Sequence, residues 1–125
     1  MMMGQERWVR VPRLRRGTAP YRAAIRHARL LATERVLHFS RLGGFQYSAI
    51  SIRNQKTRWG SCSSRGTLSF NYRLIYLPLP LLDYLIVHEL AHTKQMNHSR
   101  AFWEEVGEFV PEYRELRKDL RRYRW

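Results

Sequence analysis

The sequence predicts an α+β fold in which a small antiparallel sheet packs on one buried helix and flanking helices cover the remaining faces. The clearest strand signal is the alternation of apolar and polar residues from Thr67 to Tyr72. From Pro80 onward the pattern becomes helical and is apolar over most of the helix surface, which is typical of a buried helix. With 125 residues, of which 44% are hydrophobic, the chain has the size of one packed domain.

The N-terminal part of the chain divides into an arm and a helix. Residues 1–20 contain scattered arginines, Gly and Pro without periodicity, so we predict a flexible basic arm followed by one domain over 21–125. Apolar residues recur at roughly helical spacing from Tyr21 to Phe39, which predicts an amphipathic helix. Gly43 and Gly44 are expected to end it.

Three short strands are expected next. Partial alternation predicts a strand over 46–53, and residues 57–63 are compatible with a second one. Ser64-Arg65-Gly66 suits a hairpin turn that leads into the third strand, 67–72. We predict that this last strand lies at the edge of the sheet, where an extended polypeptide could add as a further strand.

The second half of the chain is expected to be helical. Pro80 suits a first helical position, Asn97 is predicted to end this region in the left-handed conformation, and Ser99 is predicted to cap the next helix. Two further helices are expected over 101–110 and 112–122.

The charge of the chain is strongly positive, with 23 Lys+Arg against 10 Asp+Glu and a net charge of +13. Nine arginines and two glutamates lie in residues 1–35. Such a balance favours contact with nucleic acid, ribosomes or phosphates through the Arg-rich arm, although a solvated basic surface explains it equally well. One Cys, no signal-peptide pattern and no apolar stretch of membrane-spanning length lead us to expect a cytoplasmic protein without membrane contact.

The sequence His88-Glu89-Leu90-Ala91-His92 carries the chemistry. Histidines four residues apart project from the same face of a helix, one turn apart, and can share a metal ion. Glu89 follows the first ligand directly and can take a proton from a water activated by the metal. The motif lies among apolar residues, where unpaired polar groups are costly, so a solvated histidine pair is the weaker interpretation.

A catalytic zinc site needs a third protein ligand. His98 comes ten residues after His88, beyond a predicted turn, and we favour it because the chain can double back there. The spacing is that of the third histidine in metzincins, although Lys94 and Gln95 stand where metzincins have their glycine. The rival ligands are acidic residues on the following helix: Glu104, Glu105 and Glu108. We expect one Zn²⁺ per chain, and we leave Cys62 out of the site.

The chain resembles the YgjP-like metallohydrolases, which are related to the WLM and SprT-type zincins. The resemblance rests on a series of motifs in one order: Arg58-Trp59-Gly60-Ser61-Cys62-Ser63, Asn71-Tyr72-Arg73-Leu74, Val87 to His92, Asn97-His98-Ser99 and Phe102-Trp103. It implies a minimal zincin-like core with His88, His92 and His98 as metal ligands and Glu89 as the catalytic carboxylate.

Function is expected to follow from that site. Our first hypothesis is a metallopeptidase, with Asn71, Arg73 and Arg58 as candidate substrate-binding residues. The second is a nucleoside triphosphate pyrophosphatase acting on UTP-type substrates, an activity that the resemblance also implies. The third is a basic nucleic-acid or ribosome-binding module in which zinc is only structural.

Overall fold

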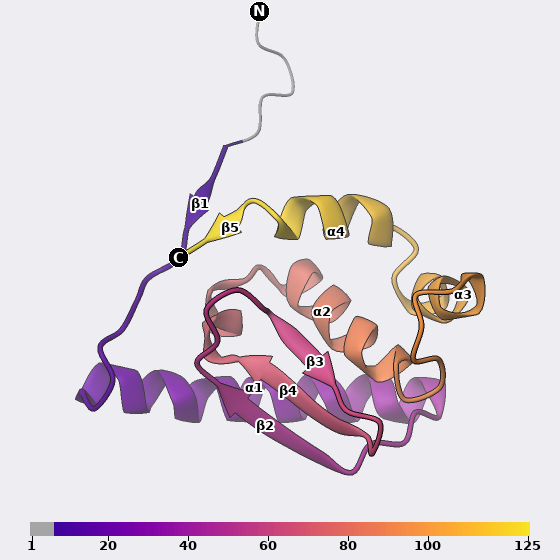
Figure 1. Ribbon diagram of the computed structural model, residues 1–125, viewed down its shortest axis with the longest axis horizontal. Helices are drawn as coiled ribbons and strands as arrows, with labels where there is room; N and C mark the ends of the chain where they lie inside the picture. The colour runs from indigo at the N-terminus through magenta and orange to yellow at the C-terminus, as the bar shows by residue number, and fades with distance from the viewer. Residues whose placement is uncertain (1–6) are drawn as a thin grey trace, which may run out of the picture.

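A computed structural model of the chain describes residues 7–125 and confirms the α+β fold class (Figure 1). A three-stranded sheet lies against two helices, α1 (Ala19–Gly43) and α2 (Leu79–Ala91). Two further helices, α3 (Arg100–Phe109) and α4 (Tyr113–Leu120), cover the opposite side of α2. The hydrophobic core lies between these elements. Its largest fully buried side chains include Tyr72, Phe70, Phe102 and Leu68.

Helix α1 spans Ala19–Gly43 and is longer at both ends than predicted. Its N-cap is Thr18, whose side chain accepts a hydrogen bond from the amide of Tyr21. Gly44 ends the helix with φ = 65°, a left-handed conformation that glycine adopts without strain. One face of the helix is buried through small and branched residues at four-residue spacing: Ala24, Ala28, Ala32 and Val36.

The sheet consists of β2 (Ala49–Arg53), β3 (Gly60–Cys62) and β4 (Thr67–Asn71), in the order β2-β4-β3. The hairpin between β3 and β4 is antiparallel, as predicted, and Gly66 occupies its turn with φ = 86°. The prediction of an antiparallel sheet was wrong for one strand pair, because β2 pairs with β4 in parallel. The prediction that residues 67–72 form an edge strand was also wrong, since β4 lies between β2 and β3.

Helix α2, Leu79–Ala91, is the buried helix that the sequence predicts. A 3-10 helix, η1 (Tyr72–Tyr76), leads into it from β4. The helix ends at Ala91, and the expected left-handed Asn97 was wrong, because no non-glycine residue in the described part of the chain has a positive φ.

The C-terminal helices agree with the expected pattern. Helix α3 spans Arg100–Phe109, and the predicted cap is confirmed, since the hydroxyl of Ser99 accepts a hydrogen bond from the amide of Phe102. Helix α4 spans Tyr113–Leu120. No helix within residues 7–125 is both long enough and apolar enough to span a bilayer.

The segment before α1 differs from the predicted flexible arm. Strand β1 (Val9–Arg10) pairs in parallel with β5 (Tyr123–Arg124) near the C-terminus (Figure 1). Val11 is only 2% exposed, and its amide donates to the carbonyl of Arg124 over 2.6 Å. Residues 7–18 therefore dock on the domain, and the part of the arm prediction that concerns residues 1–6 lies outside the described residues.

Candidate metal centre

The site is built on the last turns of α2, where the sheet and three helices enclose the helix. His88 and His92 project from the same face of α2, as the four-residue spacing predicts, with ring centroids 5.1 Å apart. His92 is buried and His88 is half-buried, so both rings lie inside the packed structure while one direction remains open.

His98 completes a cluster of three imidazoles. The chain leaves α2 through turns at residues 92–97 and returns at the N-terminus of α3, where the Ser99 cap fixes its direction. The Nε2 atom of His98 lies 3.2 Å from Nε2 of His92 and 3.4 Å from Nε2 of His88. Two ligands bound tetrahedrally at about 2.05 Å from zinc are roughly 3.3 Å apart, so these nitrogens fit one metal ion.

The rings are oriented by contacts of their other nitrogens. Nδ1 of His92 lies 3.0 Å from the carbonyl oxygen of Gln95, to which it donates. Nδ1 of His88 lies 3.3 Å from the hydroxyl of Tyr84. When Nδ1 donates in these hydrogen bonds, the lone pair is on Nε2, which is the nitrogen that faces the cluster. Phe102 stacks on His92 with ring centroids 4.4 Å apart, and this contact fixes the plane of that ring.

The electrostatics of the cluster favour the neutral forms of His88 and His98. Burial lowers the pKa of His88 to about 3, and the neighbouring His92, His98 and Arg117 add to the effect. Burial and His92 also lower the pKa of His98. Neutral rings near pH 7 are the form in which histidine coordinates a metal.

Glu89 is 5% exposed and lies on the sheet side of α2. Burial raises the pKa of its carboxyl group to about 8, partly offset by the positive charge of Arg58. The backbone of Gly60 on β3 lies against this carboxylate, since a Cβ built at Gly60 would be 3.1 Å from Oε2 of Glu89. Only glycine leaves the carboxylate its present room, which gives the Trp59-Gly60-Ser61 motif a physical role.

The rival ligands lie outside this cluster. Glu104 forms an ion pair with Arg100 over 3.6 Å, and Glu105 forms one with Lys94 over 3.7 Å. Among residues 7–125, the group that could hold a metal contains the three histidines and neither these carboxylates nor Glu108 or Cys62.

Two of the three predicted substrate residues have a different environment from the one expected. Asn71 is fully buried, and its amide donates to the carbonyl oxygens of Gln55 and Arg58 at 3.0 and 2.9 Å. Arg73 is 5% exposed, and its guanidinium donates to Gln55 O, Asn54 Oδ1 and Asn71 Oδ1. These residues hold the loop between β2 and β3 in place, because their polar groups are occupied by it.

Arg58 remains exposed on that loop, and its charge acts on Glu89.

Sequence reasoning missed two residues that complete the site, Tyr84 and Gly60. The first could have been found, because it lies four residues before His88 and therefore on the same face of the helix. The second was part of the quoted motif, but its proximity to Glu89 depends on how the sheet packs on α2.

Fold and site together define a zincin-like metallopeptidase domain in which three histidines are positioned to bind a metal. The chain belongs to the YgjP-like family, whose metallopeptidase domain matches residues 15–123. The resemblance inferred from the sequence is therefore confirmed.

Two solved structures share the fold. The metallopeptidase zymogen abylysin of Pyrococcus abyssi superposes with a TM-score of 0.66 and 26% identity, over 71% of this chain and 90% of that one. The zymogen jannalysin of Methanocaldococcus jannaschii gives a TM-score of 0.62 and 26% identity, over 71% and 92%. A UTP pyrophosphatase of Escherichia coli (strain K12) is 41% identical over 44 residues, which are 35% of this chain and 26% of that protein. The match thus spans about a quarter of this relative.

Proposed function

We propose that this chain is a zinc-dependent peptidase that binds one Zn²⁺ through His88, His92 and His98. The observation that carries the proposal is the convergence of three Nε2 atoms at the end of the helix that also carries the buried Glu89. Three protein ligands leave a fourth position of a tetrahedral site for a reactant, which is the arrangement of catalytic rather than structural zinc.

The chain's own groups supply the proton chemistry. When bound, zinc provides a Lewis acid that activates water and polarises the scissile carbonyl. Glu89 accepts the proton of the attacking water and delivers it to the nitrogen of the leaving amine as the peptide bond breaks.

Strand β3 is the edge at which we place an extended peptide. It pairs with β4 on one side only and packs against α2 on the side of the metal centre (Figure 1). Backbone groups that point toward β4 belong to Trp59, Ser61 and Ser63. The backbone N–H and C=O groups of the alternate residues, Gly60 and Cys62, therefore point to the free edge of the sheet. A substrate added as a strand there would pass beside Glu89.

The test combines metal analysis with cleavage of an unfolded protein such as denatured casein. We expect one zinc per chain and cleavage that a chelator abolishes. Glu89→Gln should retain the zinc and lose at least about a hundredfold in kcat/KM, whereas the exposed Glu108→Gln should match the wild type. His98→Ala should lose zinc. Full activity of Glu89→Gln, or zinc retained by His98→Ala, would contradict the proposal.

A second candidate is hydrolysis of UTP or a related nucleoside triphosphate at the same centre. It is favoured by the local identity to a UTP pyrophosphatase and by the exposed Arg58 beside Glu89. This function would be selected over the peptidase if the wild type released pyrophosphate from UTP and did not cleave casein. Both Glu89→Gln and Arg58→Ala should then lose the release of pyrophosphate.

A further inference from the structure

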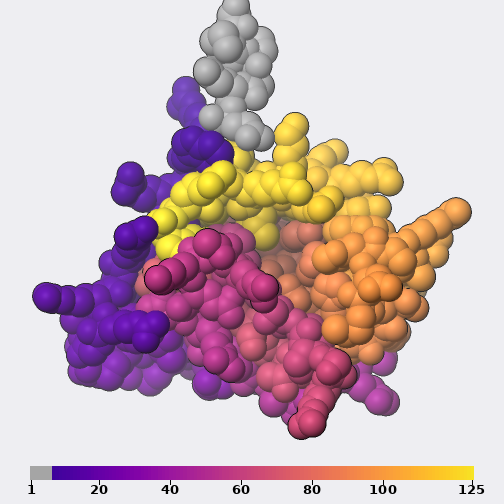
Figure 2. Space-filling model, in the orientation of Figure 1, coloured from indigo at the N-terminus to yellow at the C-terminus, as the bar shows by residue number. Residues whose placement is uncertain are grey.

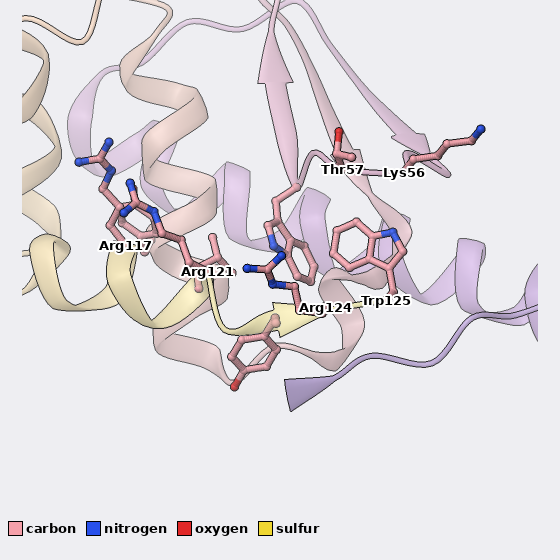
Figure 3. A pocket seen from close by; sticks show the side chains of 10 residues that line it. Lys56, Thr57, Arg117, Arg121, Arg124 and Trp125 are labelled. Carbon is pink, nitrogen blue, oxygen red and sulfur yellow. The ribbon is translucent and has the colours of Figure 1, made fainter. Parts of the chain in front are cut away.

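Three adjoining concavities form one groove along α4, β5 and β1, which we call the C-terminal groove. Arg124 lines all three, while Trp8 and Trp125 each line two, so the cavities adjoin one another. The one between α4 and the loop before β3 has a volume of about 560 Å³. Figure 3 shows it with Arg117 and Arg121 on one side, Lys56 and Thr57 on the other, and Arg124 and Trp125 between them.

The groove carries a stripe of positive charge on α4. The four exposed residues Arg114, Arg117, Lys118 and Arg121 follow the spacing i, i+3, i+4 and i+7, so they lie along one face. None of them forms an ion pair with an acidic residue among those that the structure describes. Like charges at this spacing destabilise a helix by a few tenths of a kcal/mol per pair, about 0.2–0.5.

The positive charge continues beyond α4. Arg10 and Arg13 line the groove beside β1, and Lys56 lines it from the loop before β3. No acidic residue lies among the described residues that line the three cavities. In the space-filling view the C-terminal segment lies across the same face as the loop before β3 (Figure 2). A surface of this kind attracts a polyanion.

Aromatic rings are interleaved with these cations. Trp8 is 61% exposed, and the guanidinium of Arg124 lies 4.0 Å from its ring centroid. Trp59 and Trp125 meet edge to face with centroids 4.9 Å apart, and both line the groove. Trp59 and Trp125 are half-buried, so Trp8 is the most exposed of the three rings. Indole and guanidinium planes stack on nucleobases, at about 1–3 kcal/mol per base. An acidic polypeptide would use the cations but would have no use for these planes.

We propose that the C-terminal groove binds single-stranded nucleic acid, with phosphates along the α4 stripe and bases on the tryptophans. The groove begins next to the metal centre, because Tyr84 lines it and contacts His88 through its hydroxyl. Binding of the strand needs no hydrolytic step, so the proposal goes beyond the peptidase function and stands or falls separately.

The experiment measures fluorescence anisotropy of a labelled twelve-nucleotide oligothymidylate with the full-length, zinc-loaded protein. Engagement of about four phosphates gives a slope of log K against log[salt] of about −3. Arg114→Glu with Lys118→Glu should weaken binding at least about tenfold, and Trp8→Ala should weaken it about fivefold or more. The matched control, Arg26→Glu with Arg65→Glu, changes the net charge equally on exposed residues outside the groove and should weaken binding less than about threefold.

Three outcomes would overturn the proposal. The first is equal weakening by the control pair, which would assign binding to the diffuse charge of the whole chain. In the second, polyglutamate of the same charge displaces the labelled oligonucleotide as readily as unlabelled oligonucleotide does. That result would make the groove a site for acidic polypeptides. In the third, Trp8→Ala binds the oligonucleotide as tightly as the wild type does, and the wild type binds a duplex as tightly as the single strand. That result would remove the role of base stacking. Circular dichroism of each variant checks that it is folded.

Discussion

At the scale of single residues, the site contains two ionisable groups with opposite pKa shifts on adjacent positions of one helix. Burial lowers the pKa of His88 and raises the pKa of Glu89, so both groups favour their neutral forms when no metal is bound. The sequence predicted these residues because their spacing is local and set by helix geometry. It could not predict the shifts, which depend on what packs around α2.

The pKa of Glu89 leads to a prediction about the stability of the metal-free protein. The folded-state pKa, about 8, exceeds the ordinary value of 4.5, so the folded state holds the proton more tightly than the unfolded state. The contribution of Glu89 to the free energy of unfolding therefore falls as pH rises from 4.5 to 8, by about 1.4 kcal/mol per unit. Glu89→Gln lacks this loss, so its advantage over the wild type should grow by about 3.5 kcal/mol between pH 5 and pH 8.

Urea unfolding in the presence of a chelator measures this difference at each pH. Glu108→Gln serves as the control, because that carboxylate is exposed and its substitution should leave the difference from the wild type flat. Parallel pH profiles for the wild type and Glu89→Gln would show that Glu89 does not titrate as an isolated buried acid.

At the scale of helices and strands, local patterns were predicted well and distant pairings were not. Glycine at the end of α1, the hairpin turn before β4 and the Ser99 cap are all encoded within a few residues. The parallel pairing of β2 with β4 depends on the loop that carries the chain from β2 past β4 to β3. The alternation of apolar and polar residues does not specify which strands pair with each other.

Asn71 and Arg73 illustrate the same limit within the site. Alternation correctly indicated that polar side chains occur at the end of β4, and their chemistry suggested substrate contact. The structure shows that their partners are backbone groups of the β2–β3 loop, a contact between residues 13 to 18 positions apart. A single sequence gives the types of these residues but not which groups they meet.

The close approach of β3 to α2 predicts the effect of a substitution at Gly60. In Gly60→Ala the added Cβ would lie 3.1 Å from Oε2 of Glu89 and 3.1 Å from the backbone oxygen of Ser69, so the carboxylate must move. The required shift is a few tenths of an ångström, which is less than the displacement of about 1 Å that can cost a hundredfold, so we expect kcat to fall about threefold to tenfold. Zinc content, measured by elemental analysis, should stay near the wild-type value, since the three histidines are untouched.

Ser61→Ala on the same strand is the control for Gly60→Ala. It removes a side chain that forms no hydrogen bond within residues 7–125, so we expect nearly wild-type activity. Loss of zinc together with activity in Gly60→Ala would instead indicate that the whole of α2 has shifted.

At the scale of the whole molecule, the two ends of the described chain are fastened to each other and to the core. The amide of Val9 donates to the carbonyl of Arg122 over 2.8 Å, and the amide of Leu14 donates to the hydroxyl of Tyr72 over 3.1 Å. Composition alone suggested a flexible arm here, because arginines, Gly and Pro dominate it. The pairing of β1 with β5 joins residues more than a hundred positions apart, which no local pattern reveals.

This arrangement predicts that a residue of the N-terminal segment contributes to global stability. Val11 is 2% exposed, so Val11→Ala removes about two buried methyl groups and should lower the free energy of unfolding by about 1–2 kcal/mol. The exposed Arg15→Ala on the same segment should change it by less than about 0.5 kcal/mol. Urea unfolding of the zinc-loaded protein measures both. Were Val11→Ala as stable as the wild type, residues 7–18 would not be docked in solution, and the C-terminal groove would lose the wall that Trp8 and Arg10 provide.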